Sequence, residues 1–232
     1  MLSVDASGYG GRNDVQQEDL QRELMSLLNG AATLAGLRRP EWQRQPAGDG
    51  ELAILPPTES EPVVVDDYVR ELYLALARRN WNALPGRHLR LRLAMHFGSA
   101  KAADLGYSGQ GVVEVSRLVD SRPPRLVLER SDADLVLIVS GVIFETSVAG
   151  GHTTLAPEQF RKVEVRHKEL LRDGYLFVPG RDVHAMDLGE VAVRETPKPA
   201  EPQSQPRVKT SLKDVRIQTA VFGFANGAAA DE

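Results

Sequence analysis

The sequence has no cysteine among its 232 residues. This absence excludes disulfide bonds, thiolate metal sites and cysteine nucleophiles, and it is typical of a protein of the reducing cytoplasm. An excess of basic residues is also missing: 28 Lys and Arg face 32 Asp and Glu, and the net charge is -4. Because a nucleic-acid-binding face needs clustered basic side chains, we expect no nucleic-acid partner.

Long apolar runs are absent as well. None approaches the roughly 18 to 20 residues that cross a bilayer, so we expect no membrane-spanning segment. The opening residues, MLSVDASGYGG, lack the basic start and apolar stretch of a signal peptide. We therefore expect a cytoplasmic protein. What the chain does have is an ordinary globular composition, 42% hydrophobic and 26% charged, which is enough to form a core.

The first hundred residues show clear structural patterns. A short apolar strand over Leu2–Ala6 runs into a glycine-rich turn, and Asn13 or Asp14 can cap a long helix over 15–37. An Asp-Gly pair between the apolar segments 42–45 and 51–55 predicts a hairpin. Further patterns predict a helix over 64–79 and a strand over 88–97, whose first half alternates Leu with Arg or His as if one face were wet.

The rest of the chain continues this interleaving. We predict a loop over 98–111, a helix over 112–120, and strands over 126–128, 135–139, 160–166 and 175–178. Helices and strands interleaved around a hairpin favour an α+β sandwich over an all-parallel sheet. Residues 1–181 are predicted to form the domain, 182–206 a linker that is proline-rich from 196, and 207–232 a flexible tail. The tail holds one possible strand, 215–224, and is a candidate binding segment for another protein.

Several stretches together resemble the catalytic domain of class III adenylate/guanylate cyclases. They are, in order, SVDASGYG, AGDGELAIL, LRLRLAMHFG, GQGVVEVSRL, FRKVEVRHKE and YLFVPG. No single stretch is specific, but their order and spacing over residues 1–181 are. The resemblance implies a divergent bacterial member of the family, with a ferredoxin-like βαββαβ sandwich and extra C-terminal strands.

The resemblance implies that Asp5 and Asp49 hold two divalent metal ions, Mg²⁺ or Mn²⁺, over a nucleoside triphosphate. Carboxylate oxygens suit these hard cations. If the first strand and the hairpin are neighbours, both carboxylates point into one space. The alternative for Asp5 is a turn or capping aspartate, and for Asp49 an ordinary hairpin Asp-Gly; each alternative is the stronger one when the residue is taken alone.

Phosphate contacts are implied for two basic residues and one turn. Arg117 would stabilise charge on the reacting phosphate, since a guanidinium forks onto two oxygens; the alternative is a solvated arginine paired with Glu114 or Asp120. Lys168 would hold the leaving phosphates, or be a surface lysine. The turn Gly8, Tyr9 and Gly10 offers backbone N–H groups to phosphate. His96 has no partner histidine at metal-ligand spacing, so we read it as structural.

Three positions depart from the family pattern. Gln45 stands where the family has a base-reading lysine, and Gly106 where it has the partner acid, with Asp104 the nearest carboxylate. Val113 stands in place of a catalytic asparagine, and valine cannot hydrogen-bond a ribose. The base therefore stays open, because the broad family also includes pyrimidine cyclases of bacterial antiphage signalling.

Three functions remain in view. An active cyclase would work as a homodimer, because the family site takes its aspartates from one chain and its arginine from the other. A degenerate domain would bind nucleotide or a partner and regulate something else, as the changes at Gln45 and Val113 suggest. The third is an α+β small-molecule-binding domain unrelated to cyclases.

Overall fold

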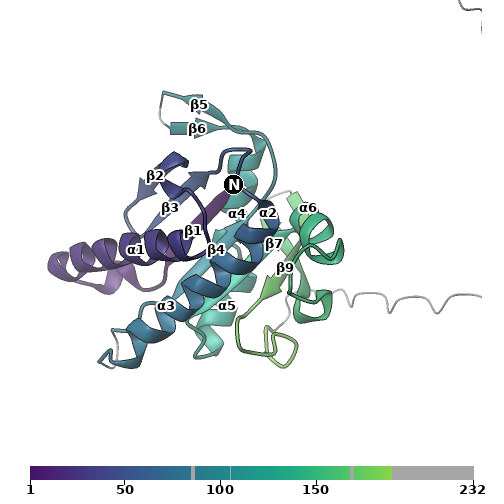
Figure 1. Cartoon of the computed structure of the whole chain (residues 1–232). Coiled ribbons are helices and arrows are strands. Elements are labelled where there is room, and N and C mark those ends of the chain that lie inside the picture. Colours follow the sequence, from purple (N-terminus) through teal and green to yellow (C-terminus); the bar gives the residue numbers. More distant parts are fainter. Residues whose placement is uncertain (85–86, 105, 168–169, 190–232) are drawn as a thin grey trace, which may run out of the picture. The chain divides into compact units, whose positions relative to one another are not determined.

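Seven strands of the described chain form one sheet in the spatial order β2-β3-β1-β4-β7-β9-β8 (Figure 1). The structure is a computed structural model, and it describes residues 1–84, 87–104, 106–167 and 170–189. The strands of this sheet are β1 Leu2–Ala6, β2 Gln43–Ala47, β3 Gly50–Ile54, β4 Leu91–Met95, β7 Leu135–Ser140, β8 Arg161–His167 and β9 Leu170–Phe177. Pairing is antiparallel except between β4 and β7.

The first half of the chain is a βαββαβ unit. β1 is followed by helix α1, Asp14–Leu34, then by the β2–β3 hairpin, helix α3, Val69–Trp81, and β4. These four strands lie in the order β4-β1-β3-β2, the ferredoxin-like arrangement, and β7, β9 and β8 extend the sheet beyond β4. The predicted α+β sandwich with extra C-terminal strands is therefore confirmed.

The long helix α1 starts where the sequence indicates. The Asn13 side chain accepts a hydrogen bond from Gln16 N at 3.0 Å, and the Gln16 side chain accepts one from Asn13 N at 3.3 Å. This reciprocal capping box satisfies two of the donors that a helix start leaves unpaired. Buried side chains at helical spacing then pack α1 against the sheet and α3: Leu20, Leu24, Leu28 and Ala31.

Each face of the sheet has its own core. Leu2, Val4 and Ala6 of β1 belong to the core shared with α1 and α3. The second core lies on the other face, with helices α4, Gln110–Asp120, and α5, Arg122–Arg130. Since successive side chains of a strand point to opposite faces, Asp5 is on the α4 and α5 side of β1.

A helical stretch precedes α3 without a break. It consists of α2, Glu61–Val63, and a π-helical turn, Val64–Tyr68. A similar stretch follows β7, with α6 at Gly141–Ile143 and a π-helical turn at Phe144–Ala149. The sequence patterns missed this second stretch, because it is too short to show a helical period.

Two sequence predictions are wrong. The strand predicted over 126–128 is the middle of helix α5, because Pro123 and Pro124 sit in the first helical turn, where a missing N–H costs nothing. A short apolar run does not by itself separate a strand from a buried helix. The predicted loop over 98–111 contains a small hairpin, β5 Lys101–Ala103 and β6 Gly106–Ser108, outside the main sheet (Figure 1).

The second core reaches past the last strand. Val183 and Leu188 are both 1% exposed and belong to it. The possible strand over 215–224 and most of the linker lie outside the described residues. Among the helices of the described residues, none is long and apolar enough to cross a membrane.

Candidate active site

The structure brings the two predicted metal ligands together. Asp5 is near the end of β1, and its strand partner is Gly50, the residue after Asp49. The hairpin turn consists of Gly48 and Asp49, and Ala6 N donates a hydrogen bond to Asp49 O at 2.8 Å. The end of β1 is thus tied to the hairpin tip that carries the second aspartate.

Asp5 also has a partner that the sequence did not suggest. Arg92 lies opposite Asp5 in the β1–β4 ladder, and its Nε donates to Asp5 Oδ2 at 2.9 Å. The same oxygen accepts a second hydrogen bond from Arg92 Nη2. The two side chains are only 17% and 11% exposed. Arg92, expected on a wet strand face, is therefore a largely buried counter-ion.

The electrostatics of Asp5 reflect this crowding. Burial raises the pKa of the Asp5 carboxyl above its ordinary value, while the hydrogen bond and the charge of Arg92 oppose the rise. The negative charges of Asp49 and Asp120 raise the pKa further. Because the Asp5 and Asp49 carboxylates repel each other, a cation between them would be favourable.

A cavity of about 280 Å³ opens beside the hairpin tip. Its wall includes the turn after β1, together with Asp49 and Arg92. Gly8 has φ 77° and so needs glycine, and the Tyr9 hydroxyl accepts a hydrogen bond from Gln21 Nε2 at 2.8 Å. Helix α5 completes the wall with Arg125, Leu128 and Glu129. Gly8, Tyr9 and Gly10, the predicted phosphate turn, thus line the same cavity as Asp49.

The donor set at this cavity fits a magnesium-type ion. Among the described residues, no group of three or more His, Cys, Asp or Glu could hold a metal by itself. Magnesium is commonly bound by one or two carboxylates, with water and substrate phosphates filling the remaining positions. Asp49, which lines the cavity, and Asp5, which is bonded to Arg92 of the cavity wall, are compatible with that mode. They are less compatible with a site built wholly from protein ligands.

Helix α4 carries the other predicted catalytic residue. Arg117 is half-buried there, and its Nη1 atom is buried without a hydrogen-bond partner in the described structure. Val113, one turn earlier, is 38% exposed. Within one chain no contact links Arg117 to the aspartates in the described structure, and Lys168 lies outside the described residues. Their roles stay predictions.

The two base-reading positions also come together. A Cβ placed on Gly106 would lie 2.6 Å from Cδ and 2.8 Å from Nε2 of Gln45. The carboxamide of Gln45 therefore occupies the space beside Gly106 in which the family's acidic side chain would start. Asp104 is exposed, in the turn between β5 and β6.

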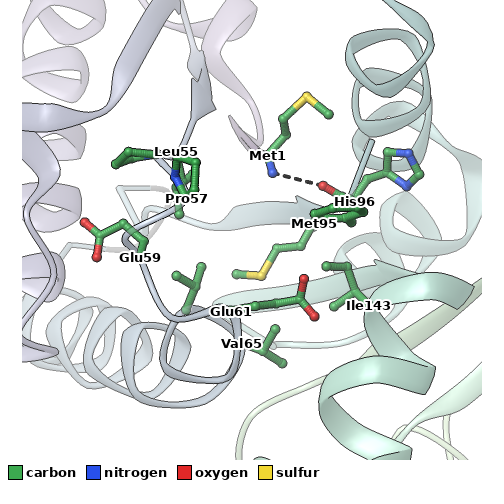
Figure 2. A pocket seen from close by; sticks show the side chains of 12 residues that line it. Met1, Leu55, Pro57, Glu59, Glu61, Val65, Met95, His96 and Ile143 are labelled. Carbon is green, nitrogen blue, oxygen red and sulfur yellow. Dashed lines mark hydrogen bonds between the residues drawn. The ribbon is translucent and has the colours of Figure 1, made fainter. Parts of the chain in front are cut away.

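A second cavity, of about 260 Å³, lies at the opposite end of β1 (Figure 2). Its carboxylates already have partners: Glu59 Oε1 accepts from Trp42 Nε1 at 2.7 Å, and Glu61 Oε1 accepts from Ser147 Oγ at 2.6 Å. The His96 ring points away from this space in Figure 2. Most of the remaining wall is apolar, with Leu55, Val65 and Met95, and does not suit a triphosphate.

Arg92 and Arg125 are the site residues that sequence reasoning missed. Arg92 stands in an alternating strand, where the pattern shows only which face it occupies. Its partner becomes visible once the β1–β4 register pairs it with Asp5. Arg125 lies between the predicted helix over 112–120 and the predicted strand over 126–128, and that strand is part of helix α5. The available signal was the pair Pro123-Pro124, which marks a helix start.

The fold just described is that of adenylate/guanylate cyclase catalytic domains. No protein-family model and no curated protein matches the chain. Among solved structures, it is similar to an adenylate/guanylate cyclase/hydrolase from Silicibacter pomeroyi, with a TM-score of 0.54 and 18% identity over 78% of this chain and 95% of that chain. At this identity the likeness is one of fold.

Two further solved structures are more distant. The guanylate cyclase domain of RhGC from Catenaria anguillulae, in complex with GTP, has a TM-score of 0.48 and 12% identity over 75% of this chain and 92% of that chain. The adenylate cyclases of Trypanosoma brucei in their monomeric state give 0.47 and 14% over 78% of this chain and 88% of that chain. The similarity to the Silicibacter pomeroyi structure confirms, for the fold, the family resemblance seen in the sequence.

Proposed function

We propose that the protein is a nucleotide cyclase that converts a nucleoside triphosphate into a 3′,5′-cyclic nucleotide and pyrophosphate. The observation that carries this proposal is the placement of Asp5 next to the hairpin tip whose Asp49 lines a polar cavity, on the fold of a cyclase domain. A metal–triphosphate site needs such carboxylates, here one from a strand and one from the turn of the neighbouring hairpin.

In the proposed reaction, the ribose 3′ oxygen attacks the α-phosphorus and loses its proton to water. The new O3′–P bond replaces the bond from the α-phosphorus to the α,β-bridging oxygen, which leaves with pyrophosphate. Two Mg²⁺ or Mn²⁺ ions, when bound, would favour ionisation of the attacking hydroxyl and offset charge on the leaving group. Asp5 and Asp49 would hold them, and Gly8, Tyr9 and Gly10 would border the phosphates.

Arg117 would act from a second copy of the chain, in a homodimer with two sites. Its side chain is half-buried on α4, and its buried Nη1 has no hydrogen-bond partner in the described structure, so no described contact holds this end of the guanidinium in place. Lys168 would assist the leaving phosphates. Gln45 would contact the base with Asp104 nearby, and since an amide both donates and accepts, it does not by itself select one base.

The decisive assay incubates the purified chain with each of the four nucleoside triphosphates and Mn²⁺, and resolves products by mass spectrometry. A cyclic product that disappears in Asp49→Ala is expected. Exposed Asp19→Ala, on α1 and outside the cavity wall, serves as the matched carboxylate control in the same assay. Asp104→Ala separately tests the proposed role of Asp104 at the base. A cyclic product that persists in both Asp5→Ala and Asp49→Ala would exclude the metal role.

A mixing experiment tests the dimer. Asp49→Ala and Arg117→Ala homodimers should each be inactive, while their mixture should regain partial activity, because a mixed dimer contains one intact site. No recovery after subunit exchange, verified by labelled subunits, would place the arginine and the aspartates on the same chain.

A second candidate function is a nucleotide-binding regulatory module without turnover. Val113 at the position of the ribose-orienting asparagine favours it, as does the Arg92 guanidinium on Asp5. Triphosphate binding that depends on Asp5 and Asp49, without any cyclic product, is the result this alternative expects.

A further inference from the structure

A third cavity, of about 330 Å³, lies next to the candidate active site. It shares Ser7 and Gly8, in the turn after β1, with the cavity that Asp49 lines. Its basic side chains come from the segment before α1 and the segment before β4: Arg12, Arg87, His88 and Arg90. Among the described residues, no Asp or Glu belongs to its wall. The wall of this third cavity is therefore positively charged.

The arginines of this wall have backbone partners rather than acidic ones. Arg12 Nη2 donates to His88 O at 3.3 Å, and Arg90 Nε donates to Ala133 O at 2.8 Å. Arg90 Nη2 also donates to Ser131 O at 2.6 Å. A backbone carbonyl satisfies a donor but carries no net charge. The guanidinium charges are therefore not neutralised by these contacts.

Two carboxylates act on the cavity from outside its wall. Burial lowers the pKa of Arg90, and the charges of Asp134 and Asp132 oppose this shift. Asp132 is already paired, since its Oδ2 lies 2.8 Å from Arg181 Nη2. Asp134 Oδ1 lies 3.9 Å from Nδ1 of His88. Asp134 alone does not balance the three guanidiniums of the wall, so an excess of positive charge remains.

The carboxylates of an adjoining cavity do not supply the missing charge either. Arg12 and Arg87 line that cavity together with Asp19 and Glu23. Both carboxylates are held by other arginines, Arg22 at 2.8 Å and Arg79 at 2.6 Å. Among the described residues, neither carboxylate forms a salt bridge with an arginine of the third cavity.

Arg12 gives a second, independent sign of a ligand. Its Nε atom is buried and has no hydrogen-bond partner in the described structure. A buried donor without an acceptor is costly, and a guanidinium matches phosphate oxygens with two parallel N–H groups. An oxyanion bound beside Arg12 would satisfy this donor and offset the charge of the wall.

We propose that the third cavity is an auxiliary anion site, separate from the candidate active site, which binds a diphosphate group through Arg12, Arg87 and Arg90. Arginines from two segments of the chain suit an anion that carries oxygens at both ends. The diphosphate is either inorganic pyrophosphate or part of a nucleotide. It lies against Ser7 and Gly8, the residues that the two cavities share. The site does not depend on the proposed cyclase function.

Isothermal titration calorimetry of the full chain with pyrophosphate tests this site. The buffer contains no divalent cations, so that the carboxylate of Asp49 disfavours anions in the active-site cavity. Arg12→Gln and Arg87→Gln should each bind about tenfold more weakly, the loss expected for one charge-assisted hydrogen bond. Neither side chain is buried, so both variants should fold. Wild-type affinity in both variants would overturn the site.

Two further arginine variants show where the pyrophosphate binds. Arg122→Gln removes the same charge from an exposed position of α5 outside the wall, and should bind as the wild type does. An equal loss in this control would reduce the effect to net charge and reject the site. Arg125 lines the active-site cavity and not the third one. A loss in Arg125→Gln, with wild-type affinity in Arg12→Gln, would place the anion in the active-site cavity and also reject the proposal.

The two sources of the diphosphate separate in the same titration. Tighter binding of a nucleoside diphosphate than of pyrophosphate, with the same loss in Arg12→Gln, would assign the site to a nucleotide. Equal or weaker binding of all four nucleoside diphosphates would assign it to pyrophosphate. The cyclase assay is a separate readout: a cyclic product that needs Asp49, without any effect of Arg12→Gln or Arg87→Gln on pyrophosphate binding, would keep the cyclase and reject the anion site.

Discussion

The carboxamide of Gln45, on β2, lies directly against the α-carbon of Gly106, on β6. The contact joins the main sheet to the small β5–β6 hairpin. Gly106 has φ 114°, a conformation that side chains with a Cβ rarely adopt, and an added Cβ would also overlap the Gln45 side chain. Two independent features therefore favour glycine at position 106: the backbone conformation and the close Gln45 side chain.

Gly106→Ala should displace Gln45 and weaken base discrimination. We expect the ratio of kcat/KM values among the four nucleoside triphosphates to fall toward one, because the Gln45 side chain would be displaced from its position beside residue 106. Tripolyphosphate affinity should not change, since no base is involved. Steady-state kinetics with each nucleotide give the measurement.

The control for that substitution is Gly36→Ala. Gly36 has a similar positive φ of 72°, but a Cβ there meets nothing within 4 Å. It carries the same kind of backbone cost without touching Gln45. If both variants lower discrimination equally, the effect is one of stability and Gln45 does not read the base.

A buried ion pair sits behind the hairpin that carries Asp49. Arg39 Nη2 lies 2.9 Å from Glu51 Oε1, and the two side chains are 3% and 1% exposed. Arg39 Nε also donates to Asn29 Oδ1 at 2.7 Å, which links the pair to α1. Arg39→Met would leave the buried Glu51 with only the longer contact to Arg44, whose Nη1 lies 4.0 Å from Glu51 Oε2 in the described structure. We therefore expect a loss of about 3 to 5 kcal/mol in the free energy of unfolding.

Urea unfolding measures this loss, and Arg22→Met provides the comparison. Arg22 pairs with Glu18 and Asp19 on the surface of α1, where an ion pair contributes about 1 kcal/mol or less. Similar losses in both variants would mean that the Arg39–Glu51 pair adds no more than a surface contact.

His96 should make stability depend on pH. Burial lowers the pKa of His96 below its ordinary value of 6.5, and Glu114 opposes that shift only in part. The folded chain thus keeps this histidine neutral while the unfolded chain protonates it near pH 6.5. Stability is therefore full above about pH 6.5 and falls as the pH drops toward the lower pKa of the folded state.

Urea midpoints between about pH 7.5 and pH 5.5 test this dependence. The wild type should lose stability over that range, and His96→Gln should lose less of it. Comparison with His152→Gln, an exposed histidine, separates the effect of burial at His96 from the removal of a histidine as such. An equal pH slope in wild type and His96→Gln would contradict the assignment.

The sequence predicted the elements whose signals are local. β1, the cap of α1, the β2–β3 hairpin and β7 follow from apolar patterns, an Asn cap and turn residues. The pairing of Asp5 with Asp49 followed from the hairpin together with the family resemblance. The strand, cap and hairpin signals depend on neighbours within a few residues along the chain. The meeting of Asp5 and Asp49 is a long-range contact, for which the family resemblance was needed.

What the sequence could not predict depends on register and on tertiary packing. Arg92 reads as a solvent-facing residue until β1 and β4 are aligned, and only that alignment places it on Asp5. The run Leu126–Leu128 reads as a strand because three adjacent apolar residues suit a strand and a buried helix equally. Contact between Gln45 and Gly106 joins two hairpins about sixty residues apart, beyond any local pattern.

Val113 offers a test by gain of function. It lies one helical turn before Arg117 on α4, and its side chain is 38% exposed, so an asparagine there costs little packing. In the family that the sequence resembles, an asparagine at this position orients the ribose through its side-chain amide. Val113→Asn should therefore raise kcat, by up to about a hundredfold if the amide supplies one well-placed hydrogen bond in the transition state. The matched control is Val115→Asn, whose fully buried position should destabilise the fold instead. An unchanged or lower kcat in Val113→Asn, with unfolding free energy as in the wild type, would show that the ribose is not held from this position of α4.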